Sequence, residues 1–153
     1  MFGGFSFSVR GASHEKTGLV CQDHSAYAVT EHYAIAAIAD GHGSKKYFRS
    51  HFGSQFAVEA ALETIRHFYM DYEKLEASFP ENPKWILKNI EKQIIMNWNV
   101  RVQQHLAANP VTPAEMKSFS TSEFKEIPPE SYYGTTLVVA VSGNGFTFGV
   151  QIG

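Results

Sequence analysis

The residues best suited to chemistry are Asp23, Asp40 and the glycine and histidine that follow Asp40. Asp40 comes directly after the small apolar run Tyr33–Ala39, which predicts a strand buried on both faces that holds the carboxylate rigidly at its end. Gly41 has no side chain, so its carbonyl could approach a cation, and His42 follows as a candidate proton donor. These residue types in this order indicate a metal-binding or acid–base site.

The spacing of the two aspartates predicts that they face each other. Residues 25–29 and 33–39 have the pattern of two strands of an antiparallel hairpin that turns at residues 30–32. Asp23 and Asp40 are equally distant from the centre of this turn, and directly opposed residues have Cβ atoms roughly 4.5–5.5 Å apart. Two carboxylates this close repel unless a cation lies between them. Paired metal ions in hydrolytic sites, about 3.5–4 Å apart, would suit such a pair.

Ordinary structural roles would also explain these residues. Asp40-Gly41 is a common turn dipeptide, and Asp23 could cap a turn at Cys21-Gln22. A surface histidine is usually solvated, and the chain contains seven histidines. Two acids without further ligands are a weak metal motif, so spacing alone leaves both interpretations open.

Composition excludes several classes of protein. The 153 residues are 44% hydrophobic and 14% aromatic, as in a packed domain or part of one. A net charge of −2 with scattered Lys and Arg argues against binding to nucleic acid or to an anionic membrane. No run approaches the ~20 apolar residues of a membrane span, and the first residues lack a signal-peptide pattern. The lone Cys21 favours a reducing compartment, so we expect a cytoplasmic protein.

The elements that position the aspartates follow from periodicity. Alternation over residues 5–9 predicts a half-buried strand, and helical spacing predicts one helix over 48–70 with Ser44 as its N-cap. Asn82-Pro83 predicts the start of a second helix that stops near residues 109–110. We expect its apolar stripe, and Trp85 with Trp98, to pack against the sheet; the stripe comprises Leu87, Ile90, Ile94, Trp98, Val102 and Leu106.

The segment after the second helix is rich in proline and reads as loop with at most one short helical turn, up to residue 130. Residues 135–141 and 146–152 then predict two strands joined by an Asn144-Gly145 hairpin. Strands, two helices and strands again indicate an α+β fold with helices on an antiparallel sheet. A strand still running at Gly153 leads us to expect that the chain is part of a longer domain.

Three motifs together resemble the type 2C family of metal-dependent (PPM-type) serine/threonine protein phosphatases. They are the Gln22-Asp23 pair, then Asp40-Gly41-His42-Gly43 after a small-apolar strand, and then residues 133–140, Tyr-Gly-Thr-Thr-Leu-Val-Val-Ala. The resemblance implies that residues 1–153 are the N-terminal part of a single catalytic domain. The complete domain would be a β-sandwich of two antiparallel sheets with flanking helices, here incomplete at its C-terminal end.

The resemblance also implies roles for individual residues. Asp40 would bridge two Mg²⁺ or Mn²⁺ ions, Gly41 would offer its carbonyl to one, and Asp23 would bind the second directly or through water. His42 matches the family's proposed general acid. The implied reaction is hydrolysis of phosphoserine and phosphothreonine by in-line attack of a metal-bridging hydroxide.

The chain departs from the family pattern at two positions. Gly18 stands where many members carry a phosphate-binding arginine, and His14 or Lys16 could replace that contact. The first member of the family's acidic pair is the neutral Gln22. Both features resemble a prokaryotic branch of the family. Lys45, Lys46 and Arg49 form a basic cluster that reads as a solvated helix start, or as an attraction for a phosphoprotein.

Several functions are compatible with this sequence. The first is a signalling phosphatase that acts on a phosphoprotein substrate and opposes a cognate Ser/Thr kinase. We expect these 153 residues alone to turn over poorly, because further metal-binding aspartates are missing, and to self-associate through uncovered sheet surface. The alternatives are a catalytically silent phosphatase-like binding or regulatory module, and a different metallohydrolase acting on small phosphoesters.

Overall fold

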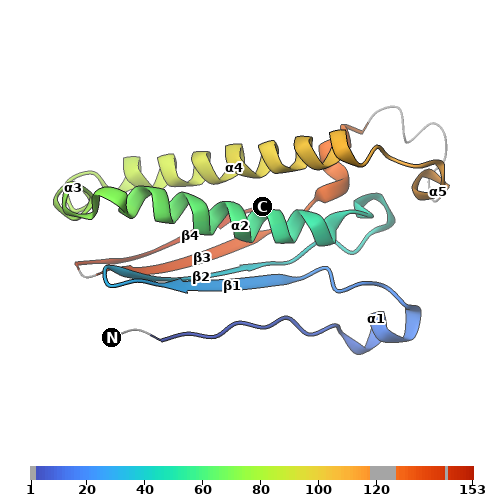
Figure 1. Cartoon of the computed structure of the whole chain (residues 1–153), viewed down its shortest axis with the longest axis horizontal. Helices are drawn as coiled ribbons and strands as arrows, with labels where there is room; N and C mark the ends of the chain where they lie inside the picture. Colours follow the sequence, from blue (N-terminus) through green and yellow to red (C-terminus); the bar gives the residue numbers. More distant parts are fainter. Residues whose placement is uncertain (1–2, 118–126, 144) are drawn as a thin grey trace.

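One antiparallel sheet with helices on one face forms the body of the molecule (Figure 1). The structure is a computed structural model and describes residues 3–117, 127–143 and 145–153. The strands are β1 (His24–Val29), β2 (Tyr33–Ala39), β3 (Leu137–Gly143) and β4 (Thr147–Ile152). The α-helices are α1 (Ala12–Thr17), α2 (Ser50–Phe68), α3 (Tyr72–Ser78), α4 (Pro83–Ala108) and α5 (Pro113–Met116), and the 3₁₀ segments are η1 (Lys45–Tyr47), η2 (Tyr69–Asp71) and η3 (Pro129–Tyr133).

The sheet has the strand order β1-β2-β3-β4, and each neighbouring pair is antiparallel. The predicted β1–β2 hairpin is confirmed, because Val29 pairs with Ala34 and His24 pairs with Ala39. The β3–β4 pairing is also as predicted; its turn residue Asn144 lies outside the described residues. The two hairpins meet where β2 pairs with β3, so the ends of the chain share one sheet.

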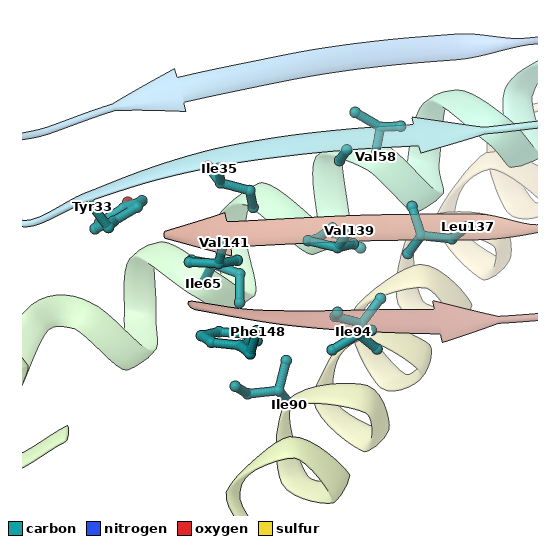
Figure 2. Packing of buried hydrophobic residues seen from close by; sticks show 14 of the residues in the cluster. Tyr33, Ile35, Val58, Ile65, Ile90, Ile94, Leu137, Val139, Val141 and Phe148 are labelled. Carbon is teal, nitrogen blue, oxygen red and sulfur yellow. The ribbon is translucent and has the colours of Figure 1, made fainter. Parts of the chain in front are cut away.

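Helices α2 and α4 cover a single face of this sheet (Figure 1). Helix α2 packs mainly on β1 and β2, whereas α4 packs on α2 and reaches β4. Figure 2 shows alternate strand residues pointing into the layer of helices, where aliphatic side chains interlock. Members of this core include Ile35, Val58, Ile65, Ile90, Ile94, Leu137, Val139, Val141 and Phe148.

The helix boundaries agree with the sequence signals except at the start of α2. Helix α4 begins with Pro83 as its first residue and ends before Asn109. Ser44 precedes the short η1 turn rather than α2, which begins only at Ser50. Helix α3 was not predicted; its N-cap Asp71 accepts a hydrogen bond from the Lys74 amide at 3.4 Å.

Two expectations about side chains were wrong. Trp85 is 69% exposed and does not pack α4 on the sheet, whereas Trp98 donates its indole N–H to the Gly53 carbonyl at 3.0 Å. Arg49 is not a solvated helix start, because it is only 4% exposed and is paired with Glu115. Its burial follows from a second apolar cluster beside it, formed by Val102, Tyr132 and Tyr133 with Phe48, Phe52 and Phe56 against them.

The second face of the sheet lacks a covering layer among the described residues. Ile38 of β2 is 57% exposed and Val138 of β3 is 44% exposed. These strands are therefore buried on one face only, and the predicted burial of residues 33–39 on both faces is wrong. Residues 5–9 pass β1 in an extended path but form no strand, and Phe7 is 72% exposed. The predicted half-buried strand is therefore wrong, since its described polar contacts reach only Ser25. In the part of the chain that is described, no helix has the length and hydropathy that a membrane span requires.

Candidate metal site

Asp23 and Asp40 lie together where the β1–β2 ladder ends. The pair His24–Ala39 closes the ladder, so Asp23 and Asp40 form the next opposed pair, in agreement with the predicted facing. Both residues line the same cavity. Partial burial raises the pKa of Asp23, the charge of Asp40 and their shared hydrogen bond raise it further, and His14 opposes the shift. The structure therefore holds two like charges close together.

The backbone at Asp40 is fixed by the two residues that directly precede β3. The amide of Thr136 and the hydroxyl of Thr135 both donate to the Asp40 carbonyl, each at 2.9 Å. An isolated bridge joins Gly41 to Thr135 directly after it. Two segments distant in sequence thus hold the acidic residue in place. The sequence did not identify these anchors, because a threonine at a strand start carries no distinctive signal.

Gly41 occupies a position where no side chain fits. A Cβ atom there would lie 2.5 Å from the Gln22 carbonyl oxygen and 2.8 Å from that of Ser50. The Gly41 amide donates to Gln22 O at 3.2 Å. Two backbone hydrogen bonds flank the Gly41–Thr135 bridge, from the Thr136 amide to the Asp40 carbonyl and from the His42 amide to the Gly134 carbonyl. Neither of them uses the Gly41 carbonyl.

His42 is close in sequence to the acidic pair but lines a different cavity. Its amide donates to Gly134 O at 3.0 Å, and its ring packs edge-on against Tyr47 with centroids 4.6 Å apart. That cavity, of about 450 Å³, lies toward α4. Asp23 and Asp40 instead line a cavity of about 400 Å³ that includes Ile38 and Val138 of the uncovered sheet face. Asp23 and Asp40 therefore line one cavity together, whereas His42 lines the other.

The two predicted phosphate contacts lie on α1. His14 is close enough to Asp23 to influence its pKa, whereas Lys16 is exposed. Gly18 follows at the helix C-cap with φ +73° and donates to Glu15 O at 3.4 Å. A left-handed C-cap favours glycine, which gives a physical reason for Gly18 at this position.

The described donors suit part of a hard-metal ligand shell. Aspartate carboxylates and a backbone carbonyl are the oxygen ligands that Mg²⁺ and Mn²⁺ take. The close carboxyl groups of Asp23 and Asp40 would also lose their mutual repulsion on binding a divalent cation. Among residues 3–117, 127–143 and 145–153, however, no three His, Cys, Asp or Glu side chains converge. Asp23, Asp40 and the Gly41 carbonyl fit such ions as an incomplete set.

Comparison with known proteins supplies the family. Residues 10–153 match the family model described as protein phosphatase 2C. No curated protein and no solved structure matches the chain. The matched region contains the acidic pair, the Gly41 turn and the threonines that anchor Asp40. The chain belongs to the protein phosphatase 2C family.

Proposed function

We propose that this chain supplies one side of the metal site of a phosphatase that hydrolyses phosphoserine and phosphothreonine in proteins. Family membership supports phosphatase function in general. The observation that carries the finer proposal is the close approach of the Asp23 and Asp40 carboxyl groups at the end of a strand pair. Such a pair is stable in its charged form only with a cation, and two Mg²⁺ or Mn²⁺ ions would fill that role.

Each residue has a defined part in this proposal. Asp40 and Asp23 would hold the ions, with the carbonyl of Gly41 as a further ligand. When bound, the ions would lower the pKa of water and neutralise charge that develops on the phosphoryl group. His14 and Lys16 would bind phosphate oxygens from α1.

His42 would donate a proton from its imidazole to the leaving serine or threonine oxygen. Its backbone is held by Gly134, and its ring rests on Tyr47. Because the ring lines the cavity toward α4 and not the one lined by the two acids, proton donation would require the leaving group to come within reach of both. This placement is also the observation that favours the second candidate function, a phosphatase-like binding module without catalysis.

The uncovered sheet face supports a larger domain. We propose that residues 1–153 form the N-terminal part of a β-sandwich, in which a second sheet covers Ile38 and Val138, exposed here to 57% and 44%. By the same reasoning the 153 residues alone self-associate through this face and turn over poorly. Sedimentation showing a monodisperse monomer would contradict the first expectation. Phosphatase activity equal to that of a longer chain would contradict the second.

The cellular setting is also part of this proposal. A reducing, cytoplasmic location rests on the single Cys21, which is half-buried and donates weakly to Asp23 O at 3.6 Å. A phosphoprotein substrate, with a kinase as the opposing enzyme, follows from the reaction. Assignment to a prokaryotic branch rests on Gln22 and Gly18.

Manganese titration by calorimetry tests the metal site directly. We expect the unaltered chain to bind Mn²⁺, and Asp40→Asn and Asp23→Asn to weaken binding at least tenfold. Glu73→Gln, an exposed acid on α3, is the matched control and should leave binding unchanged. Absence of binding, or binding indifferent to both aspartates, would overturn the phosphatase proposal in favour of the silent module.

A further inference from the structure

The neutral residue beside Asp23 is turned into the protein. Gln22 is half-buried, and its Nε2 donates to the His42 carbonyl at 3.3 Å and to Ser50 Oγ at 2.8 Å. Ser50 is fully buried in the first turn of α2. The amide therefore links the turn after Asp40 to the first turn of α2, the helix that packs on β1 and β2.

The main chain of Gln22 makes a second link between the same elements. Its carbonyl accepts from the Gly41 amide at 3.2 Å and from Ser54 Oγ at 2.5 Å. Ser54 is also fully buried, one helical turn beyond Ser50. Gln22 thus contacts Gly41 and His42 on one side and α2 on the other, through both of its polar ends.

The partners explain why a neutral amide suits this position. A backbone carbonyl can only accept hydrogen bonds, so His42 O requires an N–H or O–H from residue 22. A glutamate carboxylate would instead place an acceptor against an acceptor in a half-buried site. A buried acceptor that is left unsatisfied destabilises the arrangement around it. Glutamine and glutamate would therefore behave differently at this position although the two side chains have nearly the same shape.

We propose that Gln22 is a positioning residue that sets the Asp40–His42 turn, and is not a metal ligand. The part of this proposal that concerns metal affinity rests on the proposed function. Groups that orient the ligands of a metal typically change its affinity 10–100-fold when they are mutated. The sign of the effect of a carboxylate at position 22 separates the two roles. A ligand position would gain affinity from a glutamate, whereas a positioning residue would lose it.

The test uses Gln22→Glu, with Gln104→Glu on an exposed position of α4 as the matched control. We expect Gln22→Glu to weaken Mn²⁺ binding at least tenfold in calorimetry. Amide hydrogen exchange by NMR should show at least tenfold lower protection for Gly41 and His42, with β3 and β4 unchanged. Gln104→Glu should change neither quantity.

A second variant separates loss of the hydrogen-bond donor from the added charge. Gln22→Met removes the donor without adding charge, so it replaces Gln22→Glu should that variant fail to fold, with the same loss of protection expected at His42. If the unaltered chain binds no manganese, the proposed function fails and hydrogen exchange alone decides this proposal. Tighter manganese binding in Gln22→Glu, or unchanged protection of Gly41 and His42 in both variants, would overturn it.

Discussion

Two charged clusters in this molecule are built in opposite ways. Arg49 is 4% exposed, and its guanidinium donates hydrogen bonds to several acceptors. They are Glu115 at 2.8 and 3.1 Å, Tyr133 OH at 2.9 Å, and the carbonyls of Asn109 and Pro110. Asp23 and Asp40 instead bring two acids together. The first cluster neutralises its own charge, whereas the second leaves charge uncompensated.

The pKa shifts of the two clusters express this difference. Hydrogen bonds from Arg49 lower the pKa of Glu115 to about 2, whereas partial burial and the charge of Asp40 raise that of Asp23. A lowered carboxyl pKa stabilises the folded protein at neutral pH, and a raised one destabilises it. The Arg49 cluster therefore stabilises the folded protein at neutral pH. The aspartate pair lowers its stability, and binding of a cation would offset that loss.

The largest loss of stability should come from breaking the pairing between Arg49 and Glu115. Glu115→Ala leaves a buried guanidinium without a counter-charge, and we expect a loss of about 3 kcal/mol in the free energy of unfolding. Urea denaturation measures it. Adding Arg49→Met to this variant removes the stranded charge, so the double variant should lose less than the sum of the single changes. Strict additivity would mean that the two side chains are not coupled.

Acid should weaken the same cluster. The pKa of Glu115 is about 2 in the folded protein against an ordinary 4.5, so the folded state binds fewer protons between these values. This stabilisation is complete above pH 4.5 and is lost as pH falls toward 2. We expect on the order of 2 kcal/mol, because 30% exposure of Glu115 allows solvent to screen the pair. Denaturation of Glu115→Gln across the same pH range should lack this component.

The aspartate pair should respond with the opposite sign. Asp40→Asn removes one of two like charges, so in a chelating buffer we expect the protein to gain about 0.5 kcal/mol of stability. Thermal unfolding with a chelator and then with Mn²⁺ measures both sides, since metal should raise the melting temperature of the unaltered chain more than that of the variant. A loss of stability in chelator, like that of Glu115→Ala, would mean that the aspartate pair also stabilises the fold, as the Arg49 cluster does.

The smallest loss of stability should come from a partly exposed ion pair between two helices. Arg101 lies 2.6 Å from Glu63 on the surface of α4 and α2. Arg101→Met should cost less than about 0.5 kcal/mol, because Glu63 is 46% exposed and water screens its pairing with Arg101. Chemical denaturation at low and high salt is the check. A loss approaching that of Glu115→Ala would show that short distance, and not burial, sets the strength of these pairs.

Local pattern was enough to predict most of the elements. The two short apolar segments on either side of a polar turn placed the β1–β2 hairpin and its register, and Asn82-Pro83 placed the start of α4. These features depend on residues near each other in the chain. Asp23 and Asp40 could be predicted as neighbours for the same reason, because one hairpin carries both.

Patterns that needed a distant partner were misread. Residues 5–9 alternate like a strand, yet the described chain offers them no strand pairing. Arg49 looked solvated because Glu115, which neutralises it, lies 66 residues away. The anchoring of Asp40 by Thr135 and Thr136 could not be predicted, because these hydrogen bonds exist only once β3 lies beside β2.

The amino-acid sequence by itself determined the family motifs and the facing of Asp23 with Asp40, whereas the need for glycine at position 41 depends on the packing of Gln22 and Ser50 against it. Tertiary structure alone decided which face of the sheet is covered, where the His42 ring lies and how Gln22 holds the turn. The reason is physical: hairpin register follows from local geometry, whereas burial and side-chain partners depend on which distant segments pack together.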